Sequence, residues 1–378
     1  MRLNFLARGL AAVCLIAVAT VSTAAAADEA PLAAEAKALA ETVQKQHGAG
    51  YATRIDTARH IVYVSAVDPR ALDYVTKLLG EYADHQRETL FPLPLPWNVT
   101  VILPTVNDYR KSVPASSASG RYRPALRTLE SISFSDVLVH EFTHALHHAD
   151  QAQASQRHPV WITEGLATLF QRAAWKDGRF KVNVDPSLSA LQEALRKEKA
   201  PSLARLCEMD QPAFLADAAV CYPASRYIMF YLYKQEKLKP FYETYKADYA
   251  ADRTGAATLA KVLGKPLGEI DAEWRAWVLK LEPPWTPAHR VQAHLGVKMR
   301  TTDEGVEVAG FVRNSVAERG GVLRVGDVIL AVDGQATPTA PDLTAAVQAC
   351  KPGTTVEIEV VRGGEIVVVK QLLEATRP

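Results

Sequence analysis

The side chains best placed for chemistry in this sequence lie in the run His140-Glu141-Phe142-Thr143-His144, which has the form HExxH. Residues four apart share one face of a helix, so the two imidazoles can bind a single ion while Glu141 lies beside it. Zinc suits this pattern, because three protein ligands leave a fourth position for a water whose pKa falls toward about 7. Glu141 would then act as the general base on the zinc-bound water. The motif predicts a Zn²⁺ cofactor held by His140 and His144.

A third ligand is predicted from the sequence that follows. Ser135-Asp136 is an N-cap signal for a helix that carries the HExxH run. Pro159 is suited to begin a second helix, and Glu164 lies 20 residues after His144, which leaves room for a turn between the two helices. We expect Glu164 to complete the metal site. The alternative, in which these residues are core histidines and solvated or capping carboxylates, requires several independent coincidences of spacing.

The elements around these motifs predict an α+β body. Residues 60–64 and 97–103 have the composition of strands, and residues 69–89 carry helical periodicity. From about residue 202 to 281 the pattern is mostly helical and rich in aromatic residues. We place the body at 28–282, with a largely helical C-terminal half.

The runs HEFTH at 140–144 and WITEGLATLF at 161–170 resemble those of the gluzincins, the thermolysin-like zinc metallopeptidases (peptidase MA type). A looser likeness extends over about 55–282. The resemblance implies a thermolysin-like fold for the body, with His140, His144 and Glu164 as metal ligands and Glu141 as base and acid. The implied reaction is hydrolysis of peptide bonds through a Glu-activated zinc-bound water.

The sequence departs from the gluzincin pattern at one position. Many such enzymes have an acidic residue four positions after the ligand glutamate, where it orients a histidine, but here that position is Thr168. A threonine hydroxyl can bond an imidazole less strongly than a carboxylate does, and Asp136, four before His140, is the other candidate. We expect His147 and His148 to lie at the surface or at the rim of the cleft.

The resemblance also implies a hydrogen-bond donor for the oxyanion of the tetrahedral intermediate. Tyr222 and Tyr227 lie near the start of an aromatic-rich helix. We favour Tyr222 for this catalytic role. For either tyrosine, simple core packing is the alternative.

The cysteines give a second expectation near Tyr222. In an oxidising compartment a Cys207–Cys221 disulfide would close a short loop and contribute about 3 kcal/mol in the entropic model. The alternative is two buried thiols. Cys350 is expected to be unpaired.

The C-terminal part of the chain, residues 290–375, resembles a PDZ domain and follows a Pro-rich linker at 283–289. The resemblance rests on His294-Leu295-Gly296-Val297 and on GGVLRVGDVILAVDG at 320–334. PDZ domains bind peptide C-termini or extended segments by strand addition. By analogy, the peptide-binding residues are Leu295, Gly296, Val297, Leu343 and Val347. The alternative is an unused groove on a module that spaces or oligomerises the enzyme.

The N-terminus has the pattern of a signal peptide over residues 1–27. Arg2 and Arg8 precede an apolar stretch, and Ala25 and Ala27 occupy the cleavage positions. We therefore expect an exported protein, periplasmic or secreted, that has no stable membrane span after signal cleavage. An uncleaved segment would instead anchor it to the membrane.

Composition limits the remaining function classes. The 378 residues are 48% apolar, with 43 Lys and Arg against 42 Asp and Glu. This is ordinary globular composition, and the balanced charge offers no drive toward nucleic acid. The expected partners are protein or peptide substrates. The alternative functions are a non-catalytic PDZ adaptor on a peptidase scaffold and a zinc hydrolase of a non-peptide substrate.

Overall fold

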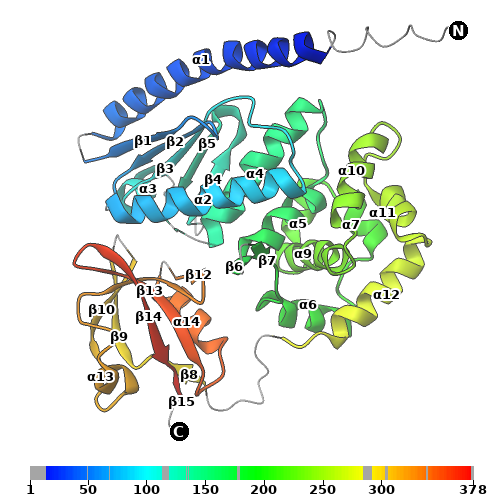
Figure 1. The fold of residues 1–378 in the computed structure, drawn as a ribbon. Helices are drawn as coiled ribbons and strands as arrows, with labels where there is room; N and C mark the ends of the chain where they lie inside the picture. The colour runs from blue at the N-terminus through cyan, green and yellow to red at the C-terminus, as the bar shows by residue number, and fades with distance from the viewer. Residues whose placement is uncertain are drawn as a thin grey trace, which may run out of the picture.

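The computed structural model describes residues 14–48, 50–67, 69–112, 119–132, 134, 136–176, 179–283, 292–302, 305–337 and 339–375. The protein is a mixed α+β structure, about half helical, with a β-rich region at its C-terminal end (Figure 1). The buried apolar side chains of the body and those of the C-terminal region form separate cores. The predicted α+β class and the β-rich C-terminal region are therefore confirmed.

Five strands form a mixed sheet in the N-terminal half of the body. In spatial order they are β1 (Ala52–Asp56), β2 (Ile61–Ser65), β3 (Val99–Leu103), β5 (Thr128–Ser131) and β4 (Gly120–Arg123). The three central strands are parallel, whereas β1 and β4 pair antiparallel with their neighbours. Strand β4 is therefore an edge of this sheet.

The central strand β2 is buried on both faces. Its Val62 and Val64 belong to a small core with alanines of helix α1 (Cys14–His47), which lies along β1 and β2 (Figure 1). The alternate residues of β2 face the main core of the body, to which helix α2 (Pro69–Thr89) also contributes. Helix α2 has the bounds that its helical periodicity predicts.

Helices dominate the body after residue 136. The first of them, α4, lies against β4 and β5, and the later helices gather away from the sheet (Figure 1). Their bounds are α4 (Asp136–Gln153), α5 (Val160–Gln171), α6 (Ser187–Arg196), α7 (Leu203–Glu208), α8 (Gln211–Ala216), α9 (Ala218–Lys234), α10 (Leu238–Asp248), α11 (Ala256–Leu263) and α12 (Leu267–Lys280). The smaller elements of the body are helix α3 (Val106–Ser112), a 3₁₀ turn (Pro124–Leu126) and the hairpin of β6 (Ala174–Lys176) and β7 (Arg179–Lys181). The helical character expected for residues 202–281 is confirmed.

The C-terminal region is a small sheet with two helices. Its elements are β8 (Ala293–His294), β9 (Val297–Thr302), β10 (Gly305–Phe311), α13 (Val316–Gly320), β11 (Val328–Val332), β12 (Gln335–Ala336), α14 (Ala340–Gln348), β13 (Thr355–Arg362), β14 (Glu365–Leu372) and β15 (Glu374–Ala375). The sheet order is β14-β13-β11-β10-β9, with β12 paired to β11 and β15 paired to β8.

Two predicted segments lie largely outside the described residues. The predicted leader, 1–27, is described only from residue 14, as the start of α1, and of the predicted linker, 283–289, only residue 283 is described. Among the helices that the structure describes, none is both long and apolar enough to span a membrane.

Candidate metal centre

Two packed helices position the predicted metal ligands. Helix α4 carries His140 and His144, and helix α5 carries Glu164. The opposite side of α4 is an apolar stripe that includes Leu138 and Phe142, both fully buried in the main core. Helix α5 begins after Pro159 and is buried along most of its length. The apolar faces thus fix both helices and leave the polar faces to meet each other.

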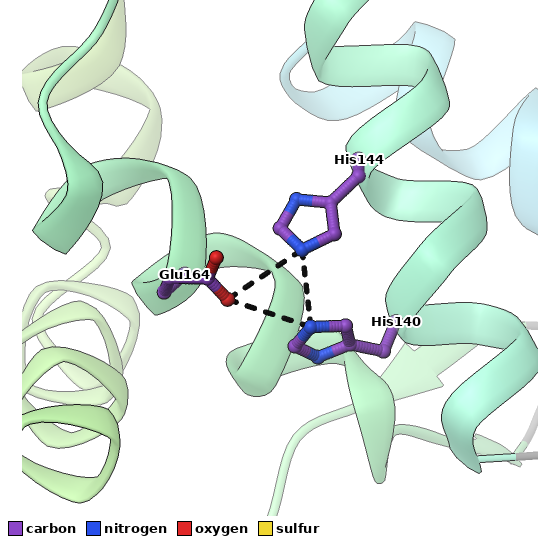
Figure 2. A group of neighbouring side chains, drawn as sticks. All are labelled: His140, His144 and Glu164. Carbon is purple, nitrogen blue, oxygen red and sulfur yellow. Dashed lines mark hydrogen bonds and ion pairs between the residues drawn. The ribbon is translucent and has the colours of Figure 1, made fainter. Parts of the chain in front are cut away.

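Three ligand atoms converge between these helices. The Nε2 atoms of His140 and His144 are 3.0 Å apart, and each lies 3.5 Å from Oε2 of Glu164 (Figure 2). Ligands 2.0–2.1 Å from a tetrahedral zinc ion are separated from one another by about 3.3 Å. The observed triangle agrees with this spacing, and the point equidistant from the three atoms is about 1.9 Å from each.

The state of Glu164 also fits a cation site. Its buried Oε2 atom has no hydrogen-bond donor of standard geometry among the described residues, and it points toward the two imidazoles. Burial raises the pKa of Glu164, but His140 and His144 outweigh that effect and lower the pKa to about 2. An ionised carboxylate and two imidazole nitrogens form a donor set that zinc prefers. The three residues therefore fit a divalent zinc ion.

Glu141 lies beside this cluster and is fixed by the edge strand. Its Oε2 atom accepts a hydrogen bond of 2.7 Å from the backbone N–H of Tyr122 in β4. Strand β4 lies close to α4 because Gly120 has no side chain there: a Cβ atom at Gly120 would lie 2.7 Å from Val137. Glycine at this position thus allows the edge strand to contact the carboxylate of Glu141.

His140 and Glu141 line an open cleft of about 570 Å³. The cleft is also bordered by Ser119 and Gly120 at the start of β4 and by Tyr222 of helix α9. This arrangement places an imidazole, a carboxylate and a phenol around one open space. Such a space can hold a substrate next to a water molecule.

The residue that bonds Nδ1 of His140 differs from both candidates named from the sequence. Thr168 donates its hydroxyl proton to the backbone carbonyl of Glu164 at 2.6 Å, within its own helix. Asp136 pairs instead with Arg172 at 3.2 Å. The Nδ1 atom of His140 bonds Oε1 of Gln171 at 3.2 Å. Gln171 lies seven residues after Glu164, two helical turns along the same face, and this spacing is the signal that could have identified it.

The structure separates the two candidate tyrosines. Tyr222 lines the cleft with Glu141, and burial, followed by the charges of Glu164 and Glu141, raises its pKa to about 12. Its hydroxyl group therefore keeps its proton at neutral pH. The buried hydroxyl of Tyr227 bonds the backbone and carboxylate of Asp185 and is committed to the core.

The expectation that His147 lies at the surface or cleft rim is wrong. Its side chain is fully buried, stacks on Phe91, and bonds His158 at 2.8 Å through Nε2. His148 is half-buried and bonds the hydroxyl of Tyr122 at 3.0 Å. The difference arises because α4 packs on more than one side, so a residue three positions after His144 still turns into the core.

The expected Cys207–Cys221 disulfide is also absent, since both residues are free thiols. Both are buried in the main core, where the sulfur of Cys221 contacts that of Met209 at 3.7 Å. Burial raises the pKa of the Cys221 thiol to about 11. Both thiols thus pack in the apolar core without forming a disulfide. Cys350 is also a free thiol, as expected.

The predicted peptide-binding residues of the C-terminal region line one groove of about 390 Å³. Leu295, Gly296 and Val297 lie at the loop leading into β9, and Leu343 and Val347 lie on α14. The remaining lining residues are uncharged or histidine, so the groove is mainly apolar.

Comparisons with known proteins identify part of the chain. A PDZ domain family model matches residues 293–371. Among curated proteins, none matches the sequence significantly. Among solved structures, the chain is similar to the HtrA-type protease AlgW with decapeptide, at 24% identity and a TM-score of 0.22, and the match covers 29% of this chain and 35% of that one.

Two further solved structures are similar to the chain. A serine endoprotease from Yersinia pestis has 18% identity and a TM-score of 0.22, over 29% of this chain and 36% of that one. An aminopeptidase N family protein from Idiomarina loihiensis has 14% identity and a TM-score of 0.37, and the match covers 86% of this chain and 66% of that one.

The chain spans about a third of the length of the AlgW structure. Because these TM-scores are low, the function must be argued from the chain's own residues. What the sequence match does show is that the chain contains a PDZ domain, at residues 293–371.

Proposed function

We propose that this protein is an exported zinc metallopeptidase of the gluzincin type, with a thermolysin-like body and a PDZ domain that recognises protein substrates or partners. The observation that carries the proposal is the convergence of His140 Nε2, His144 Nε2 and Glu164 Oε2 beside the carboxylate of Glu141. The donor types match zinc, and Glu141 supplies the proton-transfer group that hydrolysis needs.

A bound zinc ion would supply Lewis acidity, which acidifies water and polarises the scissile carbonyl group. Glu141 takes a proton from water in the cleft as the water oxygen attacks the carbonyl carbon. It then delivers that proton to the amide nitrogen as the C–N bond breaks, so a carboxylic acid and an amine leave. The hydrogen bond from the Tyr122 N–H to Oε2 orients this carboxylate and leaves Oε1 to exchange the proton.

Tyr222 is the donor to the developing oxyanion in this proposal. Tyr222 borders the same cleft as Glu141. A phenol is protonated at neutral pH, and burial raises the pKa of Tyr222 further, to about 12. A preorganised donor of this kind typically contributes about 10²–10³ to the rate.

The surroundings of the site suit a polypeptide substrate. Strand β4 is a sheet edge next to the cleft, and an extended peptide can add to such an edge through main-chain hydrogen bonds. The apolar groove of the PDZ domain offers a second place for an extended segment or a C-terminus. Both features favour proteins over small non-peptide esters or amides.

Metal analysis tests the proposal. The purified protein should contain one zinc ion per chain, and a chelator should remove both the ion and the hydrolysis of peptides. His140→Ala and Glu164→Ala should lose the metal, whereas Glu141→Gln should keep it. A protein that hydrolyses peptides equally well after complete metal removal would contradict the proposal.

A further inference from the structure

We propose that Gln171 is the positioning residue of the metal centre, in that its side-chain amide fixes the orientation and tautomer of His140. The inference rests on the proposed zinc site and assigns a residue that the HExxH and Glu164 motifs do not contain. The direct observation is the contact of 3.2 Å between Gln171 Oε1 and His140 Nδ1.

The chemistry of the imidazole determines the direction of this hydrogen bond. A histidine that binds a metal through Nε2 needs a lone pair on that atom, so its proton is on Nδ1. Nδ1–H of His140 therefore donates the hydrogen bond, and the amide oxygen of Gln171 accepts it. His140 Nε2 then presents its lone pair to the space that it shares with Glu164 Oε2 and His144 Nε2, whose positions Figure 2 shows.

The two other groups that could have taken this position are engaged elsewhere. The hydroxyl of Thr168 is bonded to the carbonyl of Glu164, and the carboxylate of Asp136 is paired with Arg172. Gln171 is therefore the group that the structure places on His140 Nδ1.

The Asp136–Arg172 ion pair also explains how Gln171 is held in place. Gln171 is the last residue of α5, and the adjacent Arg172 reaches across to Asp136 at the first turn of α4 at 3.2 Å. Asp136 lies four residues before His140, on the same face of α4. The ion pair thus ties the end of α5 to the turn of α4 that precedes His140, and it limits the distance between the amide and the imidazole.

A neutral amide in this position has a different consequence from a carboxylate. A carboxylate would add negative charge to the site and make the imidazole a more basic ligand. With Gln171, the ligand set and its immediate support carry only the charge of Glu164. Gln171 therefore orients His140 without adding the negative charge by which a carboxylate would attract the cation. Replacing Gln171 by Glu should accordingly tighten metal binding.

The test compares metal binding by full-length variants, with zinc alone and cobalt(II) alone as the probes. The dissociation constant for Zn²⁺ would be measured by competition with a chromophoric chelator. The visible spectrum of the Co²⁺ form would report the ligand geometry independently of activity. We expect Gln171→Leu to bind zinc about 10–100-fold more weakly than the parent and to change the Co²⁺ spectrum.

Two further variants separate positioning from a general structural role. Gln171→Glu should restore binding to at least the parent's affinity, because it can again accept from Nδ1–H. Thr168→Val, one turn away in the same helix, should bind zinc as the parent does. If Gln171→Leu does not fold by circular dichroism, Gln171→Asn, whose amide is one methylene shorter, replaces it with the same expected weakening.

Parent-like zinc affinity and a parent-like Co²⁺ spectrum in a folded Gln171→Leu or Gln171→Asn variant would overturn the inference. A parent protein that binds no zinc would instead overturn the proposed metal centre itself, so the two failures are distinguishable.

Discussion

The carboxylate of Glu141 and the backbone N–H of Tyr122 are joined by a hydrogen bond of 2.7 Å that links helix α4 to the edge strand of the sheet. Through this contact the strand proposed to receive an extended peptide would also orient the carboxylate proposed to transfer the proton. It depends on the close approach of β4 to α4 that Gly120 allows. We expect substrate position and proton transfer to be coupled at this edge.

Removing the hydroxyl of Tyr222 should lower turnover without disturbing the fold. For Tyr222→Phe we expect kcat to fall about 10²–10³-fold with KM nearly unchanged, because an oxyanion donor acts mainly in the transition state. The ring would keep its contact with Phe214. Steady-state kinetics on a fluorogenic peptide measure the effect.

Tyr227→Phe is the matched control for this substitution. It removes hydrogen bonds to Asp185 in the core, so it should lower the free energy of unfolding by about 1–3 kcal/mol while leaving kcat near the parent's value. A Tyr222→Phe protein with the parent's kcat would remove Tyr222 from the mechanism.

Zinc should stabilise the body in a concentration-dependent way. At free zinc 100-fold above its dissociation constant, binding to the folded state adds about 2.7 kcal/mol to the free energy of unfolding. The melting temperature should therefore rise with zinc in the parent and fall with chelator. In His144→Ala it should respond to neither, and a parent-like response in that variant would place the ion elsewhere.

The buried His147–His158 pair should make the protein sensitive to acid. Burial lowers the pKa of His147 well below 6.5 and that of His158 to about 3, so both are neutral when folded. In the unfolded chain both histidines bind protons below about pH 6.5, and this proton binding stabilises the unfolded state. The free energy of unfolding should therefore have its full value above about pH 7. Between pH 6.5 and 3 it should fall by up to about 1.4 kcal/mol per pH unit per histidine.

Urea unfolding of the zinc-free protein at pH 7.5, 6.5 and 5.5 measures this loss. In His158→Gln one of the two buried imidazoles is absent, so the fall below pH 6.5 should be shallower than in the parent. Equal slopes in the two proteins would show that His158 titrates normally in the folded state.

The PDZ domain should determine which proteins are cleaved more than how fast a short peptide is cleaved. It has a core separate from that of the body, so a chain ending at residue 283 should keep the metal site intact. We expect this truncation to alter cleavage of whole proteins while changing kcat/KM on short peptides by less than about threefold. The measurement is a parallel assay of the parent and the truncated chain on whole proteins and on short peptides, with the zinc content of each protein as the control. An equal collapse on all substrates would instead assign the domain a structural role.

The convergence of His140, His144 and Glu164 could be predicted from the sequence because it depends on short-range geometry. The i,i+4 spacing of His140 and His144 fixes their common face, and Pro159 marks the start of the helix that brings Glu164 to them. The PDZ groove residues were likewise identifiable, because the resemblance to PDZ domains carries the positions of the first loop and of the helix to this sequence, and the structure places those residues around one groove.

Other features depend on tertiary packing, which spacing along the chain does not fix by itself. The spacing of Gln171 from Glu164 places both on one face of α5, but Gln171 reaches His140 because α5 packs on α4 and Arg172 pairs with Asp136. His147 is covered by the ring of Phe91, which lies two residues after the end of α2. The free thiols of Cys207 and Cys221 reflect the way α7 and α9 fill the core, which their spacing in the chain does not reveal.

The most direct measurement compares residues 28–378 with the same chain carrying Glu141→Gln. Each would be incubated with a complex mixture of denatured peptides, with and without chelator, and the new termini would be read by mass spectrometry. We predict cleavage by the parent that chelator abolishes, and none by Glu141→Gln even though it retains its zinc. Undiminished cleavage by Glu141→Gln would contradict the assignment of this carboxylate as the proton-transfer group, and cleavage that resists the chelator would contradict the zinc centre.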